Sequence, residues 1–399
     1  MNEIFAPAKL GPITLRNRVI KAATFEGRTP DALVTPELID FHREVAAGGV
    51  GMTTVAYCAV APGGRTDRHQ IWMRPEAVAG LRDLTDAVHA EGAAVSAQIG
   101  HAGPVANAAS NRAPALCPSR MFSPLSMQAM HVPGESEIRE LIAAHANAAL
   151  LAEQAGFDAV EIHFGHNYLV SSFLSPLLNR RHDKWGGTLA NRARLAREIA
   201  RAVRDAVGDR MAVTAKLNME DGRRGGLTVP ESIQVAAWLE ADGVLDALEL
   251  TAGSSLLNPM LLFHGDAPRK EFAEVLPGPA RMGFKLVGRA FLKEYPYHEA
   301  YLLERARQFR RELSMPLILL GGITNLDTMH LAMTEGFEFV AMGRALLREP
   351  NLLQRIQADA ATQSACVHCN KCMPTIYTTT RCVFRPERTI IDLDGRQRA

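Results

Sequence analysis

Two histidines and a tyrosine fall within six positions of one another, directly after a short run typical of a buried strand. The run is Ala159–Ile162, and His163, His166 and Tyr168 follow where that strand should end. Imidazole and phenol groups in such a place can bind an oxygen atom and transfer a proton. Histidines at this spacing can also bind a metal ion, but no nearby carboxylate or cysteine completes a convincing ligand set. The three side chains therefore predict a site for a substrate oxygen, with a satisfied structural pair or a metal site as alternatives.

Two further polar residues lie inside stretches that should form buried strands. Lys216 interrupts the run Val213–Leu217, and Gln98 interrupts the run Ser96–Ile99. An isolated charge is costly to bury, so Lys216 must find an anion or an electron-rich partner such as a cofactor ring. Glutamine offers a donor and an acceptor together, which suits the edge of a pyrimidine. The alternatives are a lysine that reaches solvent from the strand end and a glutamine that has only protein partners.

Glycines follow the last two strand candidates. Gly321 and Gly322 come after the seventh candidate, and Gly343 and Arg344 come after the eighth. In α/β barrels these two loops frequently bind a phosphate through backbone N–H groups that glycine lets approach closely. Arg344 would add a charge-assisted donor. The two loops predict a phosphate site, although a glycine after a strand is also common for turn geometry alone.

Four of the six cysteines crowd into one late stretch. Cys366, Cys369, Cys372 and Cys382 follow the pattern C-x2-C-x2-C-x9-C. Such spacing is typical of a soft-metal site, either a [4Fe-4S] cluster or a tetrahedral zinc ion. A stretch without metal is the third interpretation. Six cysteines in a chain of 399 residues do not indicate a secreted disulfide framework.

Strand-like runs alternate with amphipathic helical segments, and these elements must position the polar side chains. Eight runs are expected to be strands: Val19–Thr24, Gly51–Ala56, Ala93–Ile99, Ala159–His163, Met211–Leu217, Ala247–Thr251, Leu317–Leu320 and Phe339–Met342. Helices are expected between them, at Thr35–Ala47, Pro75–Glu91, Ser136–Ala155, Ala190–Val207 and Val229–Ala241. This alternation predicts an α/β fold, a (β/α)8 TIM barrel. A doubly wound open sheet would usually carry a G-x-G-x-x-G loop after its first strand, and that loop is missing from the sequence.

Two connections are longer than barrel loops usually are. They follow strands 3 and 6, at Gly100–Pro133 and from Gly253 to about Met315. Both begin at the strand end where barrel active sites lie, which favours lids or substrate walls over decoration or oligomer contacts. We expect a barrel domain over residues 1–355 and a C-terminal cysteine-rich extension over residues 356–399.

The bulk composition argues against several classes of partner. The chain carries 44 basic and 43 acidic side chains, so there is no electrostatic reason to expect nucleic acid or a membrane surface. No run approaches the ~18 apolar residues of a membrane span, and the N-terminus does not have the pattern of a signal peptide. We therefore expect a cytoplasmic protein with a small-molecule substrate, and the sequence leaves a homo-oligomer open.

Several motifs, in order along the chain, resemble the old yellow enzyme family of flavin-dependent oxidoreductases. They are GPITLRNR at Gly11–Arg18, QIGHAGP at Gln98–Pro104, Gly156–Arg192 with FLSPLLNRR and GGTLANR, and the loops Leu320–Gly322 and Ala341–Arg344. The match covers roughly residues 3–355 and is closest to the barrel portion of the dienoyl-CoA reductase and trimethylamine dehydrogenase branch. The resemblance implies FMN, bound noncovalently at the C-terminal mouth of the barrel.

The resemblance also implies a role for each candidate residue. His163 and His166 would bind the carbonyl oxygen of the substrate, and Tyr168 would protonate the carbon beside it after a hydride from flavin N5 reaches the β-carbon. The implied reaction passes a hydride from NAD(P)H through FMN to an activated C=C bond of an enone or enoyl-type substrate. The flavin contacts would be Ala23, Thr24, Tyr57, Gln98 and Lys216, with Gly321, Gly322, Gly343 and Arg344 at its phosphate.

Other functions remain open at this point. The cysteine stretch resembles the iron–sulfur segment of the same branch, with shorter gaps, so an amine dehydrogenase or demethylase could pass electrons through a cluster to an electron-transfer partner. A non-redox phosphate-binding barrel, an isomerase or lyase, is the third candidate. Counting from Asn17-Arg18, Phe25 stands where many relatives carry Thr or Cys near the flavin, which puts flavin potential and substrate preference in question; a one-residue slip would put Thr24 there instead.

Overall fold

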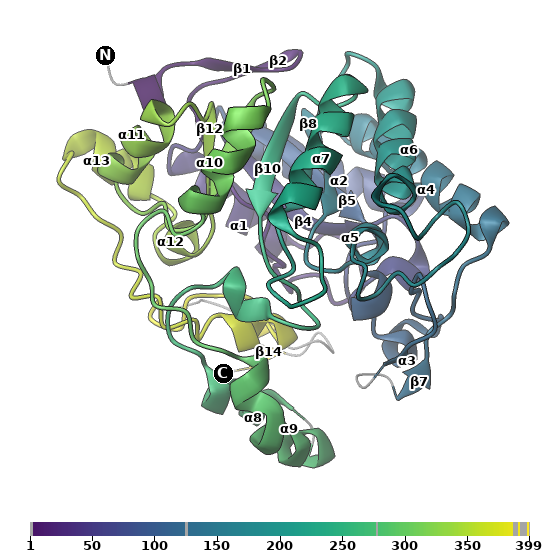
Figure 1. Cartoon of the computed structure of the whole chain (residues 1–399). Coiled ribbons are helices and arrows are strands. Elements are labelled where there is room, and N and C mark those ends of the chain that lie inside the picture. Colours follow the sequence, from purple (N-terminus) through teal and green to yellow (C-terminus); the bar gives the residue numbers. More distant parts are fainter. Residues whose placement is uncertain (1–2, 124–126, 277, 386–389, 392–396, 399) are drawn as a thin grey trace.

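In the computed structural model, eight parallel strands close into one barrel with helices around it (Figure 1). The structure describes residues 3–123, 127–276, 278–385, 390–391 and 397–398. In chain order the barrel strands are β3 (Val19–Lys21), β4 (Met52–Ala59), β5 (Ala94–Gly100), β8 (Ala159–Phe164), β9 (Ala212–Asn218), β10 (Ala247–Thr251), β11 (Leu317–Leu320) and β12 (Phe339–Met342). Strand β12 pairs with β3 and closes the ring. The predicted (β/α)8 barrel is confirmed.

The helices outside the barrel follow the strands in turn. They are α1 (Pro36–Ala47), α2 (Pro75–Ala90), α4 (Glu135–Gln154), α6 (Leu189–Val207), α7 (Val229–Ala241), α10 (Leu303–Glu312), α11 (Leu326–Thr334), α12 (Arg344–Arg348) and α13 (Leu352–Ala358). Their starts have local causes: the Leu38 N–H donates to the Thr35 hydroxyl at 3.3 Å, and Pro36 occupies the first turn of α1. A proline fits there because the first N–H groups of a helix have no helical partner.

The barrel interior changes character along its axis. At its N-terminal end, the hairpin of β1 (Ala8–Leu10) and β2 (Ile13–Leu15) packs against inward-facing apolar side chains, including Ile20, Met52 and Phe339. Nearer the C-terminal ends of the strands, the inward side chains become polar and charged, with Gln98 and Lys216 among them, both fully enclosed. The apolar end closes the barrel, and the polar end faces the mouth where the long loops gather.

Both long connections carry small elements of their own. The loop after β5 holds η3 (Gly103–Val105), α3 (Ala108–Asn111), β6 (Phe122–Ser123) and β7 (Gln128–Ala129). The insertion after β10 holds η4 (Pro259–Leu261), α8 (Arg269–Val275) and α9 (Gly278–Phe291). Figure 1 shows these loops at the end of the barrel opposite to the β1–β2 hairpin, together with the C-terminal segment.

The C-terminal segment lies against that mouth. It contains η5 (Met373–Tyr377), β13 (Ile390–Ile391) and β14 (Gln397–Arg398). The Asn370 amide donates to the carbonyl oxygens of Phe263 and Asp266 at 2.8 and 3.0 Å, which ties the cysteine loop to the β10 insertion. The N–H of Thr380 donates to the Glu26 carbonyl at 3.0 Å, which ties the segment to the loop after β3. None of the described helices combines the length and apolar character needed to cross a bilayer.

Candidate active site

The structure brings His163, His166 and Tyr168 together at the mouth of the barrel. His163 is near the end of β8, and the chain then turns sharply, with His166 and Asn167 in left-handed backbone conformations at φ of 59° and 56°. That turn folds Tyr168 back, so that its ring stacks on the His163 ring with 4.6 Å between centroids. The Nδ1 of His166 lies 3.1 Å from Nε2 of His163. The predicted cluster is therefore a single contact group.

The hydrogen bonds of the two histidines define where their protons sit. The Gly165 backbone N–H can only donate, and it lies 3.3 Å from Nδ1 of His163, so that nitrogen accepts. In the neutral ring the proton is then on Nε2 of His163, which donates to Nδ1 of His166. His166 in turn carries its proton on Nε2, 2.9 Å from the Thr251 hydroxyl. The two imidazoles form a directional chain that ends on β10.

Burial keeps the three groups uncharged. It holds the pKa of His163 well below its usual value, an effect that the His166 and Lys216 charges reinforce. It also lowers the pKa of His166 to about 3, with Lys216 again acting in the same direction. Burial raises the pKa of the Tyr168 phenol to about 12. At neutral pH the site thus offers neutral imidazole donors and a protonated phenol, a set suited to bind an oxygen and then give up a proton.

The aromatic wall beside this group contains two of the predicted flavin contacts. Tyr57 packs edge-on against Tyr168, with ring centroids 5.5 Å apart, and lies in one apolar cluster with Ala23. The hydroxyl of Thr24 is held differently, because it accepts a hydrogen bond from Lys21 at 2.9 Å. Phe25 follows Thr24 as a half-buried residue.

Below the mouth, the two predicted ring contacts belong to a charged layer inside the barrel. The Lys216 ammonium lies 3.0 Å from a Glu161 oxygen and 2.9 Å from a Glu249 oxygen. The Gln98 amide donates to the same Glu161 oxygen at 2.5 Å. The anionic partner that a buried lysine needs is thus supplied by two carboxylates, one from β8 and one from β10. Lys216 does not reach solvent, which excludes that alternative.

The glycine loops after β11 and β12 are held by packing as well as by strand geometry. Gly321 and Gly322 have φ of 98° and 77°, and a Cβ on Gly322 would lie 2.7 Å from the Ala300 nitrogen. The segment at Ala300 therefore requires glycine at position 322, whether or not this loop binds a phosphate. Around Gly343 the space is open, since a Cβ would meet nothing closer than the Thr24 methyl at 4.0 Å.

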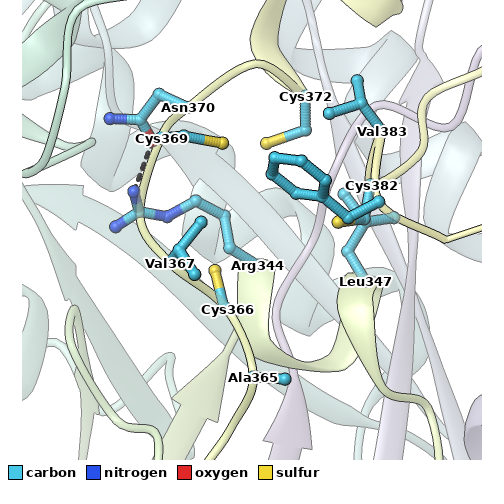
Figure 2. Close-up of a pocket in the computed structure, with 11 residues that line it drawn as sticks. Arg344, Leu347, Ala365, Cys366, Val367, Cys369, Asn370, Cys372, Cys382 and Val383 are labelled. Carbon is cyan, nitrogen blue, oxygen red and sulfur yellow. Dashed lines mark hydrogen bonds between the residues drawn. The ribbon is translucent and has the colours of Figure 1, made fainter.

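Arg344 points toward the C-terminal segment. Its guanidinium donates to the His264 carbonyl at 2.8 Å, to the Tyr301 hydroxyl at 3.3 Å, and to the side-chain oxygen of Asn370 (Figure 2). These bonds join the loop after β12, the β10 insertion and the cysteine loop. The sequence predicted a phosphate ligand here, and the structure adds that Arg344 holds three segments together.

Two positioning residues were missed by sequence reasoning. Asp221, after β9, accepts hydrogen bonds from the amides of Asn167 and Asn218 at 3.0 and 3.2 Å, and from the Ser175 hydroxyl at 2.5 Å. Asn218 accepts from the His166 N–H at 3.0 Å, so this network fixes the turn that carries the histidines. Thr251, the partner of His166, was taken only as the end of a strand. Polar residues immediately after buried strands were the available signal.

The four late cysteines line one small pocket with Arg344, and Figure 2 shows their thiol groups turned toward the same space. Within the described ranges, no set of three or more His, Cys, Asp or Glu side chains meets the geometry of a metal-binding group. The predicted [4Fe-4S] or zinc site is therefore not supported, and no chemical step is derived through a metal.

Comparisons with known proteins agree with this fold. The model of the NADH:flavin oxidoreductase / NADH oxidase family matches residues 3–252. A 4,4'-dithiodibutanoate disulfide reductase from Rhodococcus erythropolis is 55% identical over 96% of this chain and 95% of its own. A 2-naphthoyl-CoA reductase in complex with 2-naphthoyl-CoA has a TM-score of 0.77 and 26% identity, and covers 90% of this chain but only 52% of its own. An old yellow enzyme homologue from Zymomonas mobilis shares the fold, with a TM-score of 0.71, 20% identity, and coverage of 92% and 96%.

Proposed function

This chain belongs to the NADH:flavin oxidoreductase / NADH oxidase family, the family of the old yellow enzymes, and from that premise we propose that it reduces an activated C=C bond with NAD(P)H. The substrate would be of enone or enoyl type, with the carbonyl conjugated to the double bond. One observation carries the proposal: two neutral imidazoles and a protonated phenol form one contact group at the barrel mouth.

The residues of the mouth fit FMN. The Lys216 ammonium has three N–H bonds, and its contacts with the two carboxylates below it leave at least one of them for another acceptor. Among the described residues, the side-chain oxygen of Gln98 has no hydrogen-bond donor, so the pair offers both polarities to a pyrimidine edge. The clearance around Gly343 would let a phosphate group approach the backbone on that side. FMN bound there would carry the hydride from the nicotinamide to the substrate.

The two histidines would bind and polarise the substrate carbonyl. In the ligand-free arrangement each imidazole N–H already has a protein partner, His166 for His163 and Thr251 for His166. A carbonyl oxygen must therefore take over at least one of these N–H bonds. Neutral donors placed where the enolate charge develops lower the barrier, because the interaction strengthens as that charge grows.

Tyr168 would complete the addition. No hydrogen bond joins its hydroxyl to another group in the part of the chain that the structure describes, so the phenol proton is available to a ligand. A hydride is added to the β-carbon, Tyr168 gives its proton to the α-carbon, and solvent returns a proton to the phenol. The overall balance is one NAD(P)H and one proton consumed for each C=C bond reduced.

A panel of acceptors tests this proposal. FMN-loaded protein is reduced anaerobically and mixed in a stopped-flow instrument with enones, enoyl thioesters and disulfides, and flavin absorbance is followed. Oxidised protein is mixed separately with amines, which would reduce the flavin in an amine dehydrogenase. We expect the fastest reoxidation with an enone or an enoyl thioester. Reoxidation by none of the conjugated carbonyl compounds would contradict the proposal.

A second candidate is reduction of a disulfide. It is favoured by the 55% identity, over 95% of its length, with a protein described as a 4,4'-dithiodibutanoate disulfide reductase. In that reaction NAD(P)H, a proton and one disulfide give NAD(P)⁺ and two thiols, and Tyr168 would protonate a leaving thiolate. Counting released thiols against NAD(P)H consumed separates the two candidates, because ene-reduction releases none.

The remaining alternatives have less support. An amine dehydrogenase or demethylase would need the cysteine pocket to pass electrons onward, and no metal-binding group is found among the described residues. A non-redox isomerase or lyase would leave the ring-facing pair Gln98 and Lys216 without a cofactor to contact.

A further inference from the structure

Glu249 is a buried carboxylate with unusually few partners. It lies in the middle of β10 and points into the barrel, with 1% of its surface exposed. Neither carboxylate oxygen accepts a geometrically sound hydrogen bond from the described residues. The Lys216 ammonium lies 2.9 Å from Oε1, and the other charged group beside Glu249 is the Glu161 carboxylate. A buried ionised carboxylate without hydrogen bonds is costly, so this group needs an explanation.

Glu161, the other carboxylate of the layer, has a different environment. It receives the Gln98 amide at 2.5 Å in addition to Lys216 at 3.0 Å. Two donors therefore stabilise the charge of Glu161, whereas Glu249 shares a cation that is already engaged. If both carboxylates were ionised, the three buried groups would carry one excess negative charge. A proton on Glu249 removes that excess, and the ion pair that remains is Glu161 with Lys216.

The excess negative charge of these three groups matters because the proposed flavin site lies directly above Lys216. Lys216 would have an N–H available to a bound flavin ring, and reduction would add negative charge to that ring. A negative ring and an ionised Glu249 would then compete for one ammonium group across a few ångströms of low-dielectric interior. We propose that Glu249 is the proton-holding group of the flavin site, and that it takes up a proton when the bound flavin is reduced. The proposal rests on the proposed function, since it requires FMN above Lys216.

The step balances without a further reactant. NAD(P)H supplies the hydride that reduces the flavin, and solvent supplies a separate proton, which forms an O–H bond on the Glu249 carboxylate. When the substrate reoxidises the flavin, that proton returns to solvent. Where Glu249 is ionised in the oxidised protein, it is protonated and deprotonated once in each cycle, so the stoichiometry of the overall reaction is unchanged.

The surroundings of Glu249 shift its pKa in the direction that the proposal requires. Burial raises the pKa of Glu249 to about 8, the Glu161 charge adds to that rise, and the Lys216 charge opposes it. The charged groups that face Glu249 are therefore Lys216 from β9 and Glu161 from β8. On its other side β10 pairs with β11, whose residue at this register is the apolar Ile318. Lys21 lies in the next layer of buried charge, where the Lys216 charge lowers its pKa. In the oxidised protein Glu249 should thus be neutral at pH 6 and largely ionised above pH 8.

Proton uptake during reduction tests the proposal directly. FMN-loaded protein is photoreduced anaerobically in weakly buffered solution with a pH-indicator dye, at pH 6 and at pH 9, and protons bound per flavin are counted. At pH 9 we expect wild type to bind up to one proton more than E249Q, and at pH 6 we expect equal numbers. E249D keeps a carboxylate at this position and should restore the difference between the two pH values.

A second readout covers the case in which E249Q folds poorly. The reduced-minus-oxidised infrared difference spectrum of wild type at pH 9 should contain the C=O band of a protonated carboxyl, and E249D should shift it. Equal proton uptake by E249Q and wild type at pH 9, or the absence of that band, would overturn the role of Glu249 while leaving the proposed function intact. Failure of the protein to bind FMN at all would overturn both.

Discussion

Replacement of Tyr168 by phenylalanine should separate the two halves of the reaction. The change removes one hydroxyl, and the ring keeps its stacking on His163 at 4.6 Å and its edge contact with Tyr57 at 5.5 Å. Since that hydroxyl has no protein partner among the described residues, the loss of folding stability should be below about 1 kcal/mol. A positioned general acid typically contributes about 10²- to 10⁴-fold to a rate, or roughly 3 to 5 kcal/mol of activation free energy.

The assay follows the flavin of Y168F in two anaerobic stopped-flow experiments. Reduction by NAD(P)H should stay within about threefold of wild type, because no proton from Tyr168 is used there; reoxidation by an enone should slow by about 10²-fold or more. In wild type the reoxidation rate should be level between pH 6 and 9, because the pKa of Tyr168 is about 12 and the phenol stays protonated. Equal slowing of both half-reactions, or no slowing of reoxidation, would refute the acid role.

Four further predictions follow from the same geometry. Replacing His163 and His166 together by alanine should weaken the binding of phenol-type ligands by tenfold or more, about 1.4 kcal/mol, measured from flavin absorbance; unchanged affinity would remove them from the oxygen site. T251V should instead tighten phenol binding severalfold, because it frees the His166 N–H for the ligand; weaker binding would contradict the relay. D221N should lower the free energy of unfolding by about 3 kcal/mol in urea titrations, since an amide NH2 cannot accept the hydrogen bonds that Ser175 and Leu227 donate to Asp221. A loss within error of zero would exclude a structural role for Asp221. Burial lowers the pKa of His145 to about 4, so the stability that the neutral imidazole contributes is present above pH 6.5 and lost as pH falls toward 4. H145Q should lose up to about 3 kcal/mol less stability than wild type over that range. Equal acid sensitivity of the two proteins would contradict this role of His145.

Much of the barrel could be predicted because each element has a local cause. Buried runs such as Ala247–Thr251 and Phe339–Met342 have the bounds expected from their apolar composition, and α7 begins and ends where its Thr-x-Pro start and apolar spacing indicate. The histidine and tyrosine cluster was also predictable, since its members lie within six residues and share one turn.

The rest of the site depends on contacts between distant parts of the chain. Which face of β10 turns inward is decided by its register with β9, where Glu249 pairs with Lys216. In the sequence, Glu249 is a single acidic residue in a strand, and no nearby residue indicates that it will contact Lys216. Arg344 likewise meets Asn370 and His264 only because the C-terminal segment crosses the mouth beside the β10 insertion. Spacing alone predicted a metal site at the cysteines, but spacing cannot report how the four side chains are arranged in space.

The flavin itself tests the central claim most directly. Purified protein loaded with FMN is mixed anaerobically with NADH or NADPH, and then with an enone, while absorbance in the blue is recorded. The account predicts that the flavin band is bleached by one of the nicotinamides and restored by the enone, with one C=C bond reduced per NAD(P)H consumed. A protein that retains no FMN, or a bound flavin that neither nicotinamide bleaches, would contradict it.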